Sequence, residues 1–273
     1  MLMWQKSQQV ILRMLTEKLF SFAADNIKYL ISQSQTIFYK NVFKIIIFPL
    51  KYLHMIKAVI YDMDDLMVNS NPLHIRASKK VFREYEIDLQ QIPQNIRASF
   101  IGMRVADILK VVVDYFNLDL DFRKLRKQRS KIFLSLAAKE LKIMPGLMQS
   151  LEFFQKKRFR IALASSGTKE YINLVLKKFK LAKYFDVIVS GDDVKFGKPD
   201  PETYSAACEK LRVRPTEVIV LEDATKGIDA AKTAGCICIA VKNPYTLKQN
   251  LTAADLIINS LNDLKPKMLS FFR

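Results

Sequence analysis

The amino-acid sequence predicts an α/β fold: a three-layer core with a mostly parallel sheet, and an α-helical domain inserted into it. From residue 143 onward, short apolar segments alternate with helical segments, which is the pattern of a parallel sheet with right-handed crossovers. Residues 56–61 form one more apolar segment of the strand type. About 70 residues with helical periodicity alone separate this segment from the alternating part. These observations favour one core, interrupted after its first strand.

The first predicted strand runs directly into a cluster of carboxylates. Ile56 to Tyr61 is apolar except for Lys57, and Asp62, Asp64 and Asp65 follow at once. Because Asp is disfavoured inside strands, the cluster marks the carboxyl end of the strand. Carboxylates this close repel one another unless a cation lies among them, and a hard divalent cation prefers oxygen ligands. In parallel α/β sheets, ligands bind outside the carboxyl ends of the strands.

Residues 72–142 are predicted to be helical throughout, because apolar residues recur there at helical spacing. The three predicted apolar faces are Leu73, Ala77, Val81 and Tyr85; Ile108, Val111, Val112, Tyr115 and Phe116; and Leu125, Ile132, Leu136 and Leu141. No strand pattern interrupts them, so this stretch is expected to be a separate helical domain.

Helices and strands then alternate to the end of the chain. The expected helices are 147–157, 169–179, 201–211, 227–234 and one from residue 261, and the expected strands are 161–164, 187–189, 218–221, 237–241 and 256–258. The core is therefore expected to comprise residues 56–71 and 143–273, with 72–142 as the insert.

Residues 1–55 form a basic N-terminal extension with two open interpretations. Apolar residues recur in it, but no uninterrupted apolar run approaches the ~20 residues that a membrane span needs, and the order does not match a signal peptide. The segment could lie on a membrane surface as an amphipathic helix. Alternatively, Met55 is the natural start of the protein. We favour the second interpretation, because the first strand begins directly after Met55.

The composition is globular and strongly basic, with a formal net charge of +17. Such a charge suits nucleic acid, an anionic membrane or small anionic substrates. No sequence pattern of a nucleic-acid-binding module accompanies it, so nucleic acid is not expected as a partner. The three Cys residues lie in apolar surroundings and are expected to be buried free thiols in a reducing compartment, which favours a cytoplasmic location.

Polar residues suited to binding phosphate or metal follow the predicted strands. They are Asp62 and Asp64 after the first strand, Ser165 and Ser166 after the second, Lys198 in the loop after the third, and Glu222 and Asp223 after the fourth. Each is a weak signal alone, since a strand often ends in Asp at a turn. Their joint order is more specific.

This order resembles that of the haloacid dehalogenase superfamily across residues 56–265. The motifs are Asp-x-Asp at 62–64, a Ser closing a strand at 165, a Lys before Pro at 198, and the acidic pair 222–223. The resemblance implies a Rossmann-like core. The helical insert is similar to the cap of the subgroup that contains β-phosphoglucomutase and many small phosphatases.

The resemblance also implies roles for these residues. Asp62 would be the nucleophile and form an aspartyl-phosphate. Mg²⁺ would be the cofactor, bound by the side chains of Asp62 and Asp223, by Glu222 directly or through water, and by the backbone carbonyl of Asp64.

Proton transfer and phosphate binding fall to the remaining motif residues. Asp64, two residues along an extended chain from Asp62, would act as general acid and then general base. Ser165, with Ser166 beside it, would offer hydroxyl and N–H groups to the phosphoryl, and Lys198 would offer positive charge.

Two cap residues are candidates for substrate contact. His74 stands where relatives place a His near the hinge of the cap, and in the mutase that His helps to couple cap closure to proton transfer. Arg104 follows Gly102 in what resembles the substrate loop of the cap, and it could hold a distal anionic or hydroxyl group.

Two departures from the subgroup pattern stand beside the first motif. Position 65 is usually Gly and is Asp65 here, and position 69 is commonly Asp and is Asn69 here. The extra carboxylate could alter the loop conformation or point into solvent.

The sequence therefore predicts a Mg²⁺-dependent phosphatase acting on a small phosphorylated metabolite, and a monomer. The alternative is a mutase of the β-phosphoglucomutase type, which returns the phosphoryl group to a sugar. A third hypothesis, from another class, is a membrane-surface interaction protein that uses residues 1–55. A dehalogenase is disfavoured, since that chemistry does not require the acidic pair.

Overall fold

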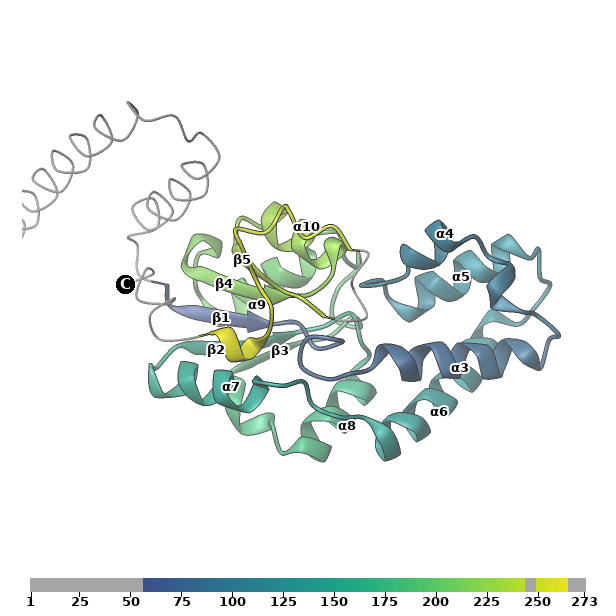
Figure 1. Cartoon of the computed structure of the whole chain (residues 1–273), viewed down its shortest axis with the longest axis horizontal. Coiled ribbons are helices and arrows are strands. Elements are labelled where there is room, and N and C mark those ends of the chain that lie inside the picture. Colours follow the sequence, from purple (N-terminus) through teal and green to yellow (C-terminus); the bar gives the residue numbers. More distant parts are fainter. Residues whose placement is uncertain (1–55, 244–248, 265–273) are drawn as a thin grey trace, which may run out of the picture. The chain divides into compact units, whose positions relative to one another are not determined.

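The core is one parallel sheet, as predicted. The structure, a computed structural model, describes residues 56–243 and 249–264. Its six strands follow the order β3-β2-β1-β4-β5-β6, and every neighbouring pair is parallel (Figure 1). The strands are β1 Ala58–Tyr61, β2 Arg160–Ala164, β3 Val187–Val189, β4 Val218–Glu222, β5 Ile237–Val241 and β6 Leu256–Ile258. The N-terminal extension, with both interpretations of it, lies outside the described residues.

Helices cover both faces of the sheet. The helices of the core are α7 Leu147–Lys156, α8 Lys169–Phe179, α9 Glu202–Leu211 and α10 Thr225–Thr233. One face of the central strands packs against α9 and α10 in a single cluster of small and branched apolar side chains. Figure 1 shows α7 and α8 on the side opposite α10. The three-layer α/β fold is thereby confirmed.

The central strand β1 is inaccessible to solvent along its whole length. It pairs with β2 on one side and β4 on the other, with Tyr61 level with Leu163 and Leu221. A strand buried on both faces needs a continuous apolar sequence, and Ala58 to Tyr61 supplies it. The chain therefore leaves the core at Asp62, at the centre of the carboxyl edge of the sheet.

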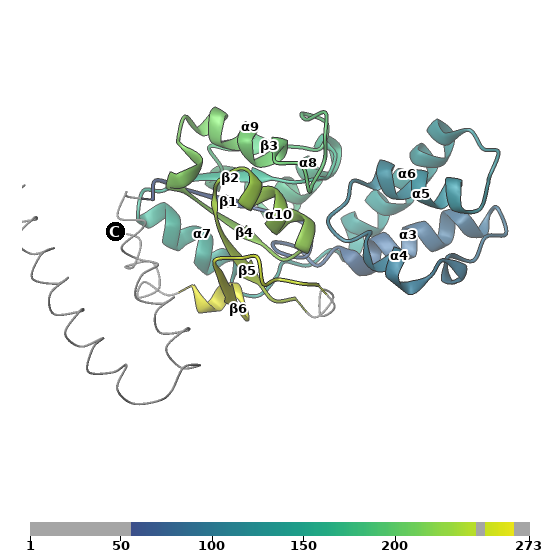
Figure 2. The ribbon, with the colours of Figure 1, turned by 90° about the horizontal axis from the view of Figure 1, so that it is seen from above.

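Four α-helices lie between β1 and α7 in the chain, where the helical insert is predicted. They are α3 Asn71–Arg83, α4 Gln94–Ala98, α5 Val105–Tyr115 and α6 Phe122–Glu140. They pack together as one group with an apolar cluster of their own (Figures 1 and 2). We propose that residues 72–142 form the cap of this protein and that the described residues on either side form its core.

The predicted apolar faces of two cap helices match the buried residues only in part, with Leu125, Leu141 and Val112 buried as predicted. In α6 the buried row is Leu125, Arg129, Phe133 and Ala137, while Ile132 and Leu136 are only partly buried. In α5 the buried residues are Leu109 and Val112, and Tyr115 is exposed. Each helix carries apolar residues on more than half of its circumference, so periodicity alone does not decide which side faces the neighbouring helix.

Three smaller findings complete the description. Residues 261–263 form a 3-10 helix in place of the start of an α-helix, and residues after 264 are not described. All three Cys residues are free and buried, as predicted. Within residues 56–243 and 249–264, no helix has both the length and the apolar content to cross a membrane.

Phe154 of α7 is expected to support the strand that carries the site. Its ring packs edge-on against Tyr61 at a centroid distance of 6.2 Å, and it is fully buried. Phe154→Ala should lower the free energy of unfolding by about 3–5 kcal/mol, because the residual cavity lies against β1. Urea denaturation measures this. Phe153→Ala, the same change on the half-buried neighbour, should cost far less, and equal losses would contradict the packing described.

Candidate active site

The sheet brings four of the predicted motifs to one edge. Asp62 follows β1, Glu222 is the last residue of β4, and the register places these two side by side, with the backbone N–H of Asp62 donating to the carbonyl of Leu221 at 3.1 Å. Ser165 follows β2 on the other side of β1. Lys198 reaches the same place from the loop between β3 and α9.

Lys198 connects two of the carboxylates. Its side chain is almost completely buried, and its ammonium group donates to Asp62 and, at 2.7 Å, to Oε1 of Glu222. Burial alone would lower the pKa of Lys198, but the two carboxylates outweigh it and raise that pKa. Lys198 therefore stays charged and holds Asp62 and Glu222 together.

Both carboxylate oxygens of Glu222 accept hydrogen bonds from protein donors. Oε1 also accepts the hydroxyl of Tyr204 at 2.7 Å, and Oε2 accepts the backbone N–H groups of Asp223 at 2.8 Å and Ala224 at 3.0 Å. A Cβ at Gly227 would lie 1.6 Å from Oε1, so the start of α10 leaves space for this carboxylate only with glycine there. Glu222 is thus fixed in one orientation.

Asp62, Glu222 and Asp223 form a group that could hold a metal ion. One oxygen from each lies within 4.8 Å of the others, and all three residues are buried. Asp223 Oδ2 is buried without a hydrogen-bond donor. Burial and the neighbouring carboxylates raise the pKa of Asp223, and burial likewise raises that of Asp62 against the opposing effect of Lys198. A divalent cation fits this donor set, because it supplies the charge that the unpartnered oxygen lacks.

Asp64 faces the cap. Its Oδ1 accepts the hydroxyl of Tyr171 at 2.9 Å, and Nε2 of His74 lies 3.7 Å from the same oxygen. Burial alone would raise the pKa of Asp64, but the contacts with His74, Ser70 and Tyr171 outweigh it and keep the pKa below its usual range. Asp64 is therefore ionised and oriented by two aromatic side chains.

His74 lies in the first turns of α3, between Asp64 and the cap interior. Its ring stacks on Phe133 at a centroid distance of 3.9 Å, and its Nδ1 is 2.7 Å from Nη2 of Arg129. Because the guanidinium can only donate, Nδ1 accepts, and the proton of a neutral ring is on Nε2, the nitrogen that faces Asp64. Burial and the charge of Arg129 lower the pKa of His74, which keeps the ring neutral.

The predicted phosphate-binding serines differ in position. Ser165 is fully buried, and its hydroxyl accepts the backbone N–H of Gly167 at 2.9 Å. Ser166 lines the main cavity, and its hydroxyl donates to the carbonyl of Gly102 in the cap at 3.3 Å. Of the two serines, only Ser166 is among the residues that line this cavity.

Arg104, predicted to contact substrate, has protein partners on both sides. Its Nε donates to Asp107 at 2.9 Å, and its Nη1 donates to the carbonyl of Lys195 in the core at 3.1 Å. Together with the contact between Ser166 and Gly102, this links the substrate loop of the cap to the core. Arg104 also lines the cavity, so its predicted role stays a prediction.

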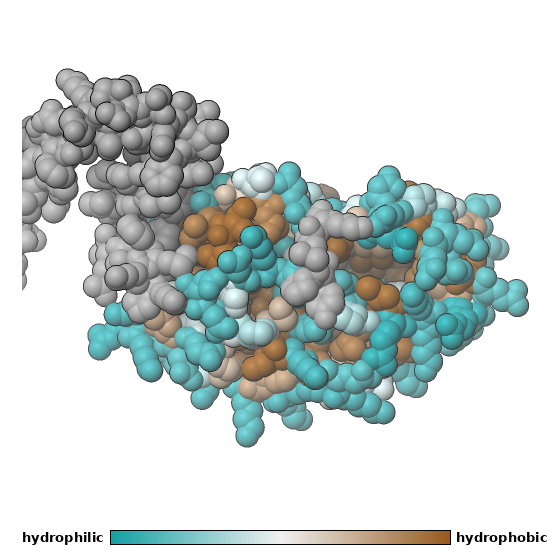
Figure 3. All heavy atoms as spheres, in the orientation of Figure 1, coloured by the Kyte–Doolittle hydropathy of each residue, from teal (hydrophilic) through white to brown (hydrophobic). Residues whose placement is uncertain are grey.

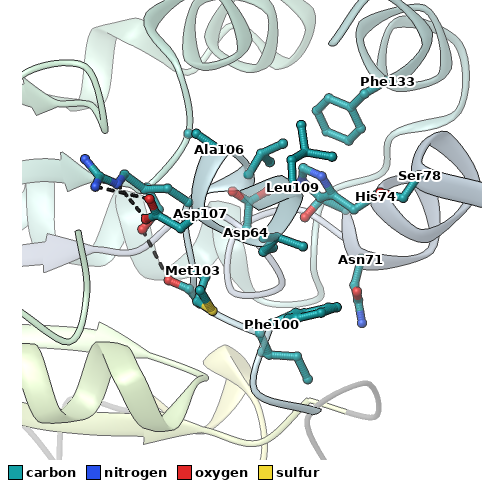
Figure 4. Close-up of a pocket in the computed structure, with 18 of the residues that line it drawn as sticks. Asp64, Asn71, His74, Ser78, Phe100, Met103, Ala106, Asp107, Leu109 and Phe133 are labelled. Carbon is teal, nitrogen blue, oxygen red and sulfur yellow. Dashed lines mark hydrogen bonds and ion pairs between the residues drawn. The ribbon is translucent and has the colours of Figure 1, made fainter. Parts of the chain in front are cut away.

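A cavity of about 720 Å³ lies between core and cap, with Asp62 and Asp64 in its wall. Figure 4 shows Asp64 near its centre, with His74 and Phe133 to one side and Phe100 and Met103 below. In Figure 3 hydrophobic side chains show in a recess between the core and the hydrophilic outer surface of the cap. The enclosure suits a small molecule whose reacting group meets the carboxylates.

Asp65 does not point into solvent. Its carboxylate is buried and accepts the backbone N–H groups of Ser70 at 3.1 Å and Asn71 at 2.9 Å, so it holds the start of α3. Its φ of 61° lies in the left-handed region, which explains why the subgroup usually has Gly here, and Asp tolerates that region better than most side chains. At Asn69, the second departure, the backbone N–H donates to the carbonyl of Lys142 at 2.9 Å, where the chain enters and leaves the cap.

Sequence reasoning missed three residues of the site. Tyr171 contacts Asp64, Tyr204 contacts Glu222, and Arg129 contacts His74. Arg129 carried a signal, because a charged residue stands in the i, i+4 row of α6 that is otherwise apolar. The two tyrosines lie on α8 and α9 among other apolar residues and carried none.

Comparisons with known proteins agree with this geometry. A family model described as haloacid dehalogenase-like hydrolase matches residues 59–241. The chain is 34% identical to a phosphorylated carbohydrates phosphatase of Thermotoga maritima, covering 66% of this chain and 82% of that protein. It is 27% identical to hexitol phosphatase B of Escherichia coli, covering 78% and 96%. The structure resembles the β-phosphoglucomutase of Clostridium difficile with a TM-score of 0.68 and 26% identity, covering 79% and 96%.

The buried Asp65 should make stability depend on pH. Burial raises its pKa to about 7, whereas an unfolded Asp titrates near pH 4. Between these values the folded protein holds an extra proton, so folding takes up a proton and becomes less favourable as the pH rises. Asp65→Asn keeps the acceptor oxygen and the backbone preference but removes this charge.

The free energy of unfolding of Asp65→Asn, relative to the unmodified protein, should therefore increase by up to about 1.4 kcal/mol per pH unit between roughly pH 4 and pH 7. Denaturant titrations of both proteins at a series of pH values measure the difference. A difference that stays constant over this range would contradict the burial of an ionisable Asp65.

Proposed function

The chain belongs to the haloacid dehalogenase-like hydrolases, and from this premise we propose that it is a Mg²⁺-dependent phosphatase. Its substrate would be a small phosphorylated metabolite, such as a sugar phosphate, and the reaction would pass through an aspartyl-phosphate. The family, predicted from the order of the motifs, is confirmed, and the protein is an enzyme of the phosphatase or mutase type. The mechanism, the metal and the substrate are the proposal.

One observation supports it above the others: the buried group formed by Asp62, Lys198, Glu222 and Asp223 at the carboxyl edge of the sheet. Lys198 binds one oxygen of Asp62, and the three carboxylate residues line the cavity between core and cap. Burying three carboxylates with a single cation leaves net negative charge. A divalent cation together with an anionic phosphoryl group completes such a site.

In the first step, an oxygen of Asp62 would form a bond to phosphorus while the ester oxygen leaves. Asp64 would donate its proton to that leaving oxygen. In the resting site Asp64 is ionised, but a phosphate dianion beside it opposes the charge and favours protonation. His74 and Tyr171 fix the carboxylate for this transfer.

In the second step, Asp64 would accept a proton from water as the water oxygen bonds to phosphorus and the bond to Asp62 breaks. Inorganic phosphate leaves, and both Asp residues return to their starting state. Lys198 stabilises the charge on Asp62 in each half. The backbone around Ser166 and Gly167, which lines the cavity, is available to the phosphoryl oxygens.

Mg²⁺, when bound, would neutralise charge between the nucleophile and the phosphoryl group. Asp62 and Asp223 would hold it by their side chains and Asp64 by its backbone carbonyl. Glu222 is bound by Lys198, Tyr204 and two backbone N–H groups, so we propose that it acts on the metal site through these contacts and through water.

A phosphosugar mutase is the second candidate. It is favoured by the likeness to β-phosphoglucomutase and by the contacts that join the cap to the core, because a closed cap keeps water from the aspartyl-phosphate. The same residues would then transfer the phosphoryl group back to a sugar hydroxyl.

The proposed phosphatase is tested by measuring phosphate release from a panel of phosphorylated sugars, polyols and nucleotides. Release should require Mg²⁺ and stop with EDTA. Asp62→Asn should abolish it while the protein stays folded, since an amide is a poor nucleophile toward phosphorus. Asp114→Asn, on the exposed side of the cap in a pair with Lys110, is the matched control and should keep full activity. Full turnover by Asp62→Asn would contradict the assignment of Asp62 as the nucleophile.

The mutase is tested with β-glucose 1-phosphate and a trace of the corresponding bisphosphate. A mutase should form glucose 6-phosphate, detected by coupled oxidation, faster than it releases phosphate. We expect the enzyme to release phosphate from its substrates faster than it transfers the phosphoryl group to a sugar. Formation of glucose 6-phosphate without phosphate release would overturn the phosphatase in favour of the mutase.

A further inference from the structure

Two basic side chains are buried in the part of the chain that the structure describes, and they differ in their partners. Lys198 is 5% exposed and is paired with two carboxylates. Arg129 is 3% exposed, and no described carboxylate lies within ion-pair distance of it. The carboxylate of Asp64 acts on Arg129 from beyond ion-pair distance and only partly offsets the effect of burial, which is unfavourable for a charge with no counter-ion in contact. Arg129 therefore needs an explanation that Lys198 does not.

The contacts of Arg129 are all with neutral groups. Its Nη2 lies 2.7 Å from Nδ1 of His74 and donates to the carbonyl of His74 at 3.2 Å, and its Nε donates to the hydroxyl of Ser78 at 3.4 Å. Its guanidinium carbon lies 5.1 Å from the ring centroid of Phe133. Nη1 makes no hydrogen bond to a described residue. Burial lowers the pKa of Arg129 to about 10, so the guanidinium remains charged at neutral pH.

Arg129 lines the same cavity as the catalytic carboxylates, from the cap. The cap adds further basic side chains to the wall, namely Lys79, Arg97, Arg104 and Arg126. Its one acidic contribution, Asp107, is paired with Arg104. The core contributes the carboxylates of the site, so the cavity is acidic at the core and basic at the cap.

Between these ends the cap wall is mainly apolar, with Phe82, Phe100, Leu109 and Phe133 among its residues. Figure 4 shows His74, Ser78 and Phe133 on one side of the pocket and Phe100 on another. Apolar walls pack against a carbon skeleton and do not bind a second charge. Among the basic side chains of the wall, Arg129 is the buried one, whereas Arg104 is paired with Asp107 and the other three are exposed to solvent.

We propose that Arg129 binds a second anionic group of the substrate, a phosphate or a carboxylate, distal to the phosphoryl group that is transferred. The substrate is then a small metabolite with two anionic groups joined by a short carbon skeleton. Its Nε and Nη2 already donate to Ser78 and His74, so Nη1 supplies the N–H donors that remain for an oxyanion, and the charge of the guanidinium strengthens that contact. The inference rests on the proposed function for the position of the transferred group.

A second, structural role for Arg129 is to hold His74, and the test must separate the two. Matched substrate pairs do so: fructose 1-phosphate with fructose 1,6-bisphosphate, ribose 5-phosphate with ribose 1,5-bisphosphate, and glucitol 6-phosphate with 6-phosphogluconate. The first two pairs add a phosphate, and the third adds a carboxylate. The measured quantity is the ratio of kcat/KM for the doubly anionic member to that for its partner.

The unmodified enzyme should prefer the doubly anionic member of at least one pair. The distal group of that member can be a phosphate or a carboxylate. Arg129→Gln should lower that ratio roughly 10- to 100-fold, the value of one or two charge-assisted hydrogen bonds, mainly through KM. Arg129→Lys should recover part of the ratio. Arg123→Gln, on the exposed part of α6 and outside the cavity wall, is the matched control and should leave the ratio unchanged.

If Arg129→Gln lowers kcat/KM equally for both members of every pair, Arg129 only holds His74. That result would overturn the inference, but the proposed phosphatase activity would stand. The absence of any preference in the unmodified enzyme would also overturn the inference. If no ester is hydrolysed, the proposed function fails, and binding decides the inference alone. In that case the rise in Tm produced by each compound with Mg²⁺ is compared in Asp62→Asn and Asp62→Asn/Arg129→Gln. Equal rises in the two proteins, or no rise in either, would overturn it.

Discussion

The buried ammonium group of Lys198 is the interaction on which the site depends. Asp62 and Glu222 end adjacent strands, so the parallel register forces two carboxylates together at the edge of the sheet. Lys198 donates to both, and these two charge-assisted contacts offset the burial of its ammonium group. The remaining donors around Glu222 and the space left by Gly227 fix the arrangement before any ligand binds. One oxygen of Asp223 is buried without a hydrogen-bond donor, and a positive charge beside it would stabilise the site.

A second set of contacts runs from this group into the cap. Tyr171 and His74 meet Asp64, Phe133 stacks on His74, and Arg129 contacts the other side of the imidazole. The proposed acid/base residue is therefore oriented by side chains from both parts of the molecule. A change in the position of the cap would alter the surroundings of Asp64 directly, without movement of the sheet. In the proposed mechanism, substrate that binds in the cap would in this way affect proton transfer at Asp64.

The strands and the motif residues could be predicted because both depend on the local sequence. Ala58 to Tyr61 is apolar, Asp62 follows, and parallel sheets collect the carboxyl ends of their strands. The contacts of Tyr171, Tyr204 and Arg129 could not be predicted in the same way, because they depend on how helices far apart in the chain pack. In α6 the buried row includes a charged residue, so apolar periodicity alone does not identify the row that contains Arg129. Asp65 was unexplained in the sequence because its left-handed φ and its hydrogen bonds to Ser70 and Asn71 appear only in the folded loop.

The central claim is that Asp62 carries the phosphoryl group during turnover. The most direct measurement is mass spectrometry of the protein quenched in acid while it turns over an excess of substrate with Mg²⁺, since acyl phosphates survive acid better than base. We expect a mass increase of one phosphoryl group that maps to the peptide containing Asp62 and disappears when EDTA is added before the substrate. A phosphoryl group on any other residue, or steady turnover without a covalent adduct in rapidly quenched samples, would contradict the account.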